Sequence, residues 1–429
     1  MAGATKAARI PMNKAPPEVP TFEKWWHPFP GGVPPDTRRL LMAKALRAFT
    51  DGLVSIVLPV YLLRLGYNAF HVGAIVTSTL LGSALLTLSI GLFAHQFPGR
   101  RLLLGASLLM AATGLLFASV HAFWPLVIVA FVGTINPSAG DVSIFLPVEQ
   151  ALLAGTISPR RRTALFARYS LIGALAGATG TLAAGLPEIV SRKFSVDETT
   201  VLQSVFVLYA VVGIGALLIY RSLSLRTAVQ EFPTSKALSH SRRIVFELAA
   251  LFSLDAFGSG FFVQSLLALW LFNTFRLSVV TASSILFWMG LCSAVSYLIA
   301  VPISERFGLI NTMVFTHLPA NFLLMVVPFA PNLPTAIALL VARSALSEMD
   351  VPTRTSYVMA VVRPEERAAT ASITAVPRSF ASALSPLFAG YLLGVSTFGW
   401  PLLFGGSLKA AYDILLLLRF RHVAPPEES

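Results

Sequence analysis

Twelve mostly apolar stretches follow one another along the chain, each long enough to supply the roughly 20 residues that cross a bilayer as a helix. Short polar or basic segments separate them. We expect the first six near residues 41–63, 71–94, 102–120, 124–154, 164–186 and 201–220, and the second six near residues 245–271, 281–304, 310–328, 334–360, 369–393 and 399–418. The pattern predicts an all-α integral membrane protein with twelve transmembrane helices.

The composition supports a membrane protein. Of the 429 residues, 55% are hydrophobic and only 12% are charged, which is about half of the roughly 25% typical of soluble domains. The net charge of +12 could indicate nucleic-acid binding, but the basic residues lie in short runs between apolar stretches. Such runs are typical of cytoplasmic loops, so we expect a lipid bilayer and no nucleic acid as partner.

The basic residues also predict the orientation. Thirteen Lys and Arg residues lie in the loops after even-numbered stretches, against four in the loops after odd-numbered ones. Because cytoplasmic loops carry the excess of Lys and Arg, both termini are expected in the cytoplasm. We expect the protein in a plasma membrane, of the bacterial inner-membrane type.

The two halves of the chain match each other weakly but in the same order. The residues around Asp51 match those around Asp255, and Leu146–Gln150 matches Val351–Thr355. Parallel repeats of six helices are typical of one class of transporter. The repeat predicts two pseudo-symmetric six-helix bundles, with the chain divided into a tail (1–40), a first bundle (41–220), a cytoplasmic linker (221–244), a second bundle (245–420) and a tail (421–429).

Two loops give the chain a family resemblance. "GLFAHQFPGRR" after the second stretch and "SERFG" after the eighth are similar to G-x-x-x-D-R-x-G-R-R, the loop signature of the major facilitator superfamily. His95 or Gln96 replaces the acidic residue of the first copy. The resemblance implies a monomer in which these loops gate the cytoplasmic side, through Gly91, Gly99, Arg100, Arg101, Glu305, Arg306 and Gly308.

The fifth stretch resembles the glycine-rich fifth helix of the same family. Its glycines include Gly173, Gly177 and Gly180. The resemblance favours export, in exchange for protons, over uptake. Glycines at this spacing are also typical of closely packed membrane helices, and that alternative stays open.

Ionisable residues within the membrane cost about 2.5–3.5 kcal/mol each on insertion scales and are therefore candidates for function. Here they concentrate in the first, fourth, seventh and tenth stretches, the four helices that line the central cavity in the resembled family. The main candidates for substrate binding and proton coupling are Asp51, Glu149, Asp255, Asp350 and Arg354. Further candidates are Arg47, Asp141, Arg343, Glu348 and Arg378.

The spacing of these residues suggests partners. Asp350 and Arg354 are four residues apart and share a helix face. Glu149 matches Arg354 across the repeat, so the two could pair or could share an anionic substrate. Pro147 and Pro352 each remove a helix hydrogen bond and are expected to loosen the fourth and tenth helices.

Asp51 and Asp255 differ in their surroundings on the helix. Arg47, four residues before Asp51, could neutralise it; alternatively Asp51 is a protonatable carboxylate. Asp255 has Leu251 at the matching position, which makes it the better candidate for a neutral, protonated acid.

Three polar positions outside these four stretches also have expected partners. Lys409 and Asp413 are four residues apart and are expected to satisfy each other. His317 is expected to be packed or hydrogen-bonded. Arg378 could reach the membrane interface or pair with an acid of the tenth stretch.

The sequence has no phosphate-binding loop, no H-E-x-x-H motif and no Cys/His metal spacing. We therefore expect no cofactor, no metal and no enzymatic activity. The favoured function is secondary transport of a small solute, polar or anionic, by alternating access and with proton coupling. The alternatives are a facilitative uniporter, a sensor or scaffold with the same fold, and a membrane-embedded enzyme acting on lipid.

Overall fold

A computed structural model describes residues 34–93, 97–138, 143–156, 162–224, 241–363 and 366–421. The first group of helices comprises α2 (Pro35–Arg64), α3 (Ala69–Phe93), α4 (Gly99–Ser119), α5 (Phe123–Val132), α6 (Phe145–Thr156), α7 (Arg162–Ala183), α8 (Leu186–Phe194) and α9 (Glu198–Arg221). The second group comprises α10 (Arg242–Gly260), α11 (Gln264–Phe275), α12 (Val279–Phe307), α13 (Leu309–Val326), the short η3 (Val327–Phe329), α14 (Leu333–Ser347), α15 (Asp350–Val361), α16 (Arg367–Val395) and α17 (Trp400–Phe420).

Each predicted span corresponds to helical structure within a few residues of its expected limits. In the described part of the chain, nine helical stretches are long and apolar enough to cross a membrane. The three predicted spans not among them are the fourth, formed by α5 and α6, the tenth, formed by α14 and α15, and the eleventh, α16. The predicted all-α membrane fold is confirmed.

Three predicted spans differ from expectation because each is two helices. The fourth breaks between Val132 and Phe145, the seventh between Gly260 and Gln264, and the tenth between Ser347 and Asp350. Pro147 and Pro352 are each the third residue of the helix that follows the break. Proline is tolerated there because the first turn has no partner for its missing N–H. The two prolines therefore stand at helix starts and do not bend a continuous helix.

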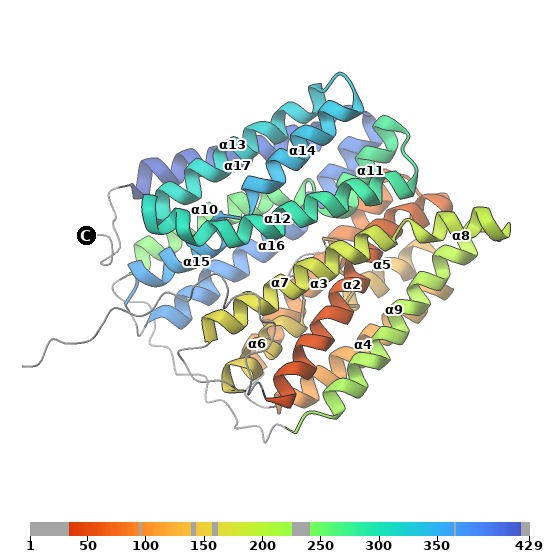
Figure 1. Cartoon of the computed structure of the whole chain (residues 1–429), viewed down its shortest axis with the longest axis horizontal. Coiled ribbons are helices and arrows are strands. Elements are labelled where there is room, and N and C mark those ends of the chain that lie inside the picture. The colour runs from red at the N-terminus through yellow and green to blue at the C-terminus, as the bar shows by residue number, and fades with distance from the viewer. Residues whose placement is uncertain are drawn as a thin grey trace, which may run out of the picture.

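The two groups of helices lie side by side in the structure (Figure 1). Within the first group α2 packs on α7 and α4 on α9; within the second, α10 packs on α16 and α13 on α17. Contacts between the groups run along α3 with α16 and along α7 with α12. We call the end that carries α8 and α11 the α8 end, and the opposite end, which carries α6 and α15, the α15 end (Figure 1).

Two glycines form the crossing of α3 with α16. A Cβ added to Gly73 would lie 2.5 Å from the carbonyl oxygen of Pro386 and 2.8 Å from the Cα of Gly390. Neither distance leaves space for a side chain, so the two backbones touch, as they do where small residues join membrane helices. Close packing of this kind holds the two groups together.

Hydrogen bonds between the two groups lie at the α8 end. Gln264 Nε2 donates to Thr181 Oγ1 at 2.7 Å, and the Ser265 amide donates to the Pro137 carbonyl at 3.2 Å. The Val280 amide donates to Glu188 Oε2 at 3.1 Å. Within the described ranges, these three are the hydrogen bonds that join the two groups.

Candidate functional site

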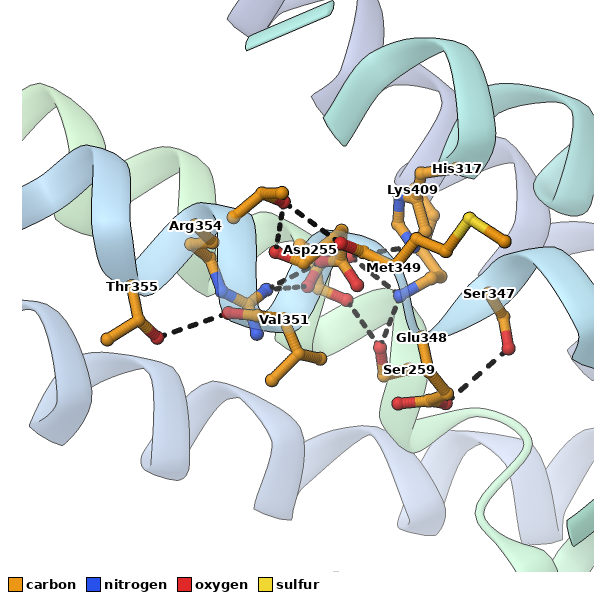
Figure 2. Close-up of polar contacts among 12 residues, drawn as sticks. Asp255, Ser259, His317, Ser347, Glu348, Met349, Val351, Arg354, Thr355 and Lys409 are labelled. Carbon is orange, nitrogen blue, oxygen red and sulfur yellow. Dashed lines mark hydrogen bonds and ion pairs between the residues drawn. The ribbon is translucent and has the colours of Figure 1, made fainter. Parts of the chain in front are cut away.

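The second group of helices encloses a cluster of charged side chains around Asp255 (Figure 2). Lys409 Nζ, from α17, donates to Asp255 Oδ1 at 2.6 Å, and Arg354 NH1, from α15, donates to Oδ2 at 3.2 Å. His317 Nε2, from α13, lies 3.9 Å from Oδ1. All four side chains are buried. The prediction of a neutral, protonated Asp255 relied on the absence of a cation four residues earlier on its own helix, and that local reasoning missed these partners because they come from other helices.

Arg354 joins two carboxylates. Its NH1 group donates to Asp350 Oδ2 at 3.1 Å, four residues earlier on the same helix, as well as to Asp255. The predicted contact between Asp350 and Arg354 is confirmed. One guanidinium thus balances charge from both α10 and α15, at the start of the helix that follows the break.

A third carboxylate, Asp413 on α17, extends the cluster. His317 Nδ1 lies 2.8 Å from Asp413 Oδ1, and Asn321 Nδ2 donates to Asp413 Oδ2 at 2.8 Å. The expected pairing of Lys409 with Asp413 is wrong, because Lys409 turns towards Asp255. The expectation of a hydrogen-bonded His317 is confirmed, and its imidazole stands between two carboxylates.

The first group of helices holds a separate buried cluster around Glu149. Arg47 forms an ion pair with it, the Tyr169 hydroxyl donates to it, and the Tyr220 hydroxyl donates to Oε1 at 2.6 Å. The Arg47 guanidinium also lies over the Phe145 ring, 3.9 Å from its centre. Three helices, α2, α7 and α9, therefore supply the donors that surround this carboxylate from α6.

These contacts correct two expectations about pairing. Glu149 and Arg354 do not pair with each other, because each has partners in its own group of helices. Arg47 forms its ion pair with Glu149 on another helix, and of the two alternatives for Asp51 the pairing with Arg47 is reduced to a longer-range effect of its charge. A local sequence pattern could not distinguish these partners.

The two clusters are related by the repeat, with the charges exchanged. The ion pair of the first group joins a cation of α2 to an anion of α6. The ion pair of the second group joins an anion of α10, Asp255, to a cation of α15, Arg354. Since α6 and α15 are repeat equivalents, the two bundles bury pairs of opposite polarity at comparable places.

The remaining candidates differ in their surroundings. Asp51, on α2, is partly exposed, and its charge acts on Arg47. The Arg343 guanidinium lies 4.7 Å from the centre of the Phe262 ring. Glu348 accepts a hydrogen bond from Ser347 Oγ at 3.4 Å (Figure 2).

Two further predicted residues lie elsewhere. Arg378, on α16, is partly exposed, and the charges of Asp255 and Asp350 act on it. Asp141 lies outside the described residues.

The predicted gating loops lie at the α15 end, where α3 ends and α4 begins and where α12 ends and α13 begins. In the first loop, Arg100 donates to the carbonyl oxygen of Arg221 on α9. In the second, the Arg306 guanidinium lies 5.4 Å from the Phe307 ring centre, and Gly308 adopts a φ of 81° at the turn. His95, Gln96 and the side chain of Glu305 lie outside the described part of the chain. A gating role stays a prediction.

Several polar partners were missed by the sequence analysis. Tyr169 and Tyr220 donate to Glu149, Asn321 donates to Asp413, and Ser259 Oγ accepts from Lys409 Nζ at 2.6 Å. The available signal was a polar atom within an otherwise apolar stretch. That signal marks a residue that must find a buried partner but does not identify the partner.

Comparison with known proteins places the chain among membrane transporters. A profile of the Major Facilitator Superfamily matches residues 40–272 and 248–429. The uncharacterized membrane protein YJR124C of Saccharomyces cerevisiae is 22% identical over 420 residues, covering 90% of this chain and 94% of that protein.

Solved structures show the same fold at low sequence identity. The nucleoside transporter NupG has a TM-score of 0.69 at 15% identity, covering 91% of this chain and 100% of NupG. A bacterial homologue of the human lysosomal transporter Spinster, in an inward-facing, unoccupied conformation, has a TM-score of 0.64 at 13% identity. The match covers 89% of this chain and 94% of the homologue.

Proposed function

Because the chain belongs to the major facilitator superfamily, we propose that it is a proton-coupled secondary transporter of a small solute that works by alternating access. Membership and the transporter structures establish a multi-pass membrane transporter, not an enzyme. The proposal adds the energy source, the conformational cycle and the residues that carry them. It places a monomer in the plasma membrane with both termini in the cytoplasm.

The observation that carries the proposal is the cluster around Asp255. Four helices, α10, α13, α15 and α17, meet at one carboxylate that faces Lys409, Arg354 and His317. Protonation of Asp255 would remove the charge that holds Lys409 and Arg354, and an unpaired buried cation is costly. Proton binding and a movement of these helices would therefore favour each other.

His317 gives the cluster a second protonatable position. Its ring nitrogens face Asp413 and Asp255. A proton could pass between the carboxylates through the ring as the helices move. This role supports coupling to protons over a facilitative uniporter.

The hydrogen bonds between the bundles support alternating access. Those formed by Gln264, Ser265 and Val280 close the α8 end, which is the outer end if the termini are cytoplasmic. A typical hydrogen bond contributes about 0.5–1.5 kcal/mol net, so opening this end would cost only a few kcal/mol. A free-energy difference of a few kcal/mol allows the closed and the open state of the α8 end to interconvert. In the proposed cycle, the described conformation is the one that is closed at the α8 end.

Export is the direction that the glycine-rich segment favours. Gly180 has a packing explanation as well, because a Cβ there would overlap the carbonyl oxygen of Phe49 on α2. The direction of transport therefore stays a prediction, and measuring flux in both directions tests it.

Proton flux into proteoliposomes tests the proposed function. Purified full-length chain is reconstituted with a pH-sensitive dye inside, and pools of small metabolites are added outside. We expect at least one pool to change the internal pH in liposomes with wild-type protein and not in liposomes with Asp255→Asn. The matched control is Glu247→Gln on the same helix, whose exposed carboxylate pairs with Arg243 and Arg419.

The outcomes separate the alternatives. Solute uptake without a proton signal would indicate facilitative transport. A proton signal that persists in Asp255→Asn would place the coupling elsewhere. Absence of any solute movement, from any pool and in either direction, would favour a sensor or scaffold.

A further inference from the structure

Two arginines lie inside the second group of helices without a carboxylate partner. Arg354 contacts two carboxylates and Lys409 contacts one. Arg343 on α14 and Arg378 on α16, by contrast, form no ion pair with any residue in the described ranges. Both are partly exposed, whereas Asp255, Arg354 and Lys409 are buried. A charge within a membrane protein that lacks a partner and retains accessible surface is a candidate for binding a ligand.

The packing of α16 on α10 places Arg378 beside the Asp255 cluster. The Ser241 amide, just before α10, donates to Glu366 Oε2, just before α16, at 3.3 Å. Near the other end of α10, a Cβ at Gly260 would overlap the carbonyl oxygen of Ser382. These contacts join residues 125 and 122 positions apart, so the helices run parallel and Asp255 lies level with residues 377–380. The charges of Arg354 and Asp255 both act on Arg378.

Arg343 lies further along α10 than Asp255, towards the α8 end. Its guanidinium faces the ring of Phe262, which lies in the break between α10 and α11. Its Nε is buried and has no hydrogen-bond partner. A guanidinium that stacks on an aromatic ring keeps its edge available for a planar acceptor. The charges of Glu348 and Asp255 act on Arg343, but neither carboxylate forms an ion pair with it.

We propose that Arg343 and Arg378 bind the negatively charged group of the transported solute, a carboxylate or a phosphate. This inference rests on the proposed transport function and names its substrate class. Guanidinium groups bind both anions through paired N–H groups. A bound anion would also repel the nearby Asp255 carboxylate and so favour its protonation. By reciprocity, a proton on Asp255 would then favour the anion, which favours cotransport of the two over the exchange that the glycine-rich segment predicts.

Thermal unfolding of the purified full-length chain in detergent, without added lipid, tests the substrate class. The probes are inorganic phosphate and benzoate, each compared with chloride at equal ionic strength, and benzamide serves as the neutral counterpart of benzoate. The variants are Arg343→Gln and Arg378→Gln. Arg363→Gln is the matched control, because it removes the same charge at an exposed position.

We expect phosphate or benzoate, but not benzamide, to raise the unfolding midpoint of the wild type and of Arg363→Gln in a saturable manner. In Arg343→Gln and Arg378→Gln, the same rise should need at least about tenfold more anion, which corresponds to about 1.4 kcal/mol. A response to phosphate alone would assign phosphate esters, and a response to benzoate alone would assign carboxylates. Omitting lipid excludes an anionic headgroup as the source of the effect.

Two results would overturn the proposal. One is an equal anion response in the wild type and in both glutamine variants; the other is no saturable response to either probe in the wild type. If a glutamine variant does not fold, Arg343→Lys and Arg378→Lys replace it, because lysine keeps the charge and lacks the planar fork. These variants should fold and bind the anion more weakly, and unchanged binding would count against the proposal. Neither result changes the expected proton flux in liposomes, so that experiment tests the proposed function independently of anion binding.

Discussion

The pairing of Asp255 with Lys409 leads to a specific expectation for a double-mutant cycle. Asp255→Asn removes the anion shared by Lys409 and Arg354 and leaves Lys409 buried without a carboxylate. Lys409→Met removes one of two cations, and Asp255 keeps Arg354. The double variant removes both members of a pair and leaves Arg354 with Asp350. Asp255→Asn should therefore be the most destabilised of the three.

The distances give the magnitude. At 2.6 Å for Lys409 and 3.2 Å for Arg354, the attraction to Asp255 is about 6 and about 5 kcal/mol with an effective dielectric constant near 20. Desolvation costs several kcal/mol per buried ion and offsets much of this. Breaking a buried pair by removing one partner typically costs about 3–5 kcal/mol, whereas replacing both is often neutral. We expect a loss of about 3–5 kcal/mol for Asp255→Asn and a recovery of most of it in Asp255→Asn/Lys409→Met.

The assay is reversible unfolding of each purified variant, from which the free energy of unfolding and the coupling energy are obtained. Neighbouring residues in a shared network typically couple by about 0.5–3 kcal/mol. Glu247→Gln is the control, because that exposed surface pair should contribute about 0–1 kcal/mol. Additive effects of the two single substitutions would refute the pairing. So would an Asp255→Asn protein as stable as Glu247→Gln.

Three other expectations concern the packing, the first cluster and the α8 end. Gly180→Ala should lower the free energy of unfolding by about 1–3 kcal/mol through overpacking, because its Cβ would overlap a carbonyl of α2. The control is Gly215→Ala, where a Cβ meets nothing within 4 Å and should cost no stability. Equal midpoints of the two variants in a thermal scan would contradict this. Glu149→Gln should cost about 3–5 kcal/mol, because it leaves a buried arginine without its anion; a midpoint equal to the wild type would be inconsistent with the ion pair. Gln264→Ala removes one hydrogen bond between the bundles and should make the α8 end open more often. A cysteine placed at Ser265, in a Cys292→Ser background, should then be labelled up to about tenfold faster. An unchanged labelling rate would argue against a closed α8 end.

The features that could be predicted from the sequence are those that a single helix carries. Hydropathy placed the spans, because each must match the thickness of the bilayer. The spacing of Asp350 and Arg354 predicted their contact, because four residues complete about one turn. The concentration of charged residues in the first, fourth, seventh and tenth stretches was also visible in the sequence, because each stretch can be assigned its own residues without knowing how the helices pack.

The partners between helices could not be predicted in this way. Lys409 has an acid four residues away on its own helix but pairs with Asp255 on α10. Glu149 matches Arg354 in the repeat, yet each is neutralised within its own bundle. These choices depend on the rotation and packing of helices far apart in the chain. The helix breaks were also hidden, because hydropathy averages over a window longer than the break.

Distances between spin labels at the two ends of the molecule test the central claim, which is that the two bundles move relative to each other so that the two ends open in turn. One pair replaces Lys193 and Arg276 at the α8 end; the other replaces Arg221 and Arg363 at the α15 end. All four positions are exposed. Measurements are made in lipid nanodiscs, in a Cys292→Ser background, at neutral and acidic pH and with and without benzoate.

The account predicts opposite changes at the two ends. As conditions shift the population, a longer distance should appear for the α8-end pair while a shorter one appears for the α15-end pair. Distances that stay fixed under all conditions, or that lengthen together at both ends, would contradict alternating access by this chain.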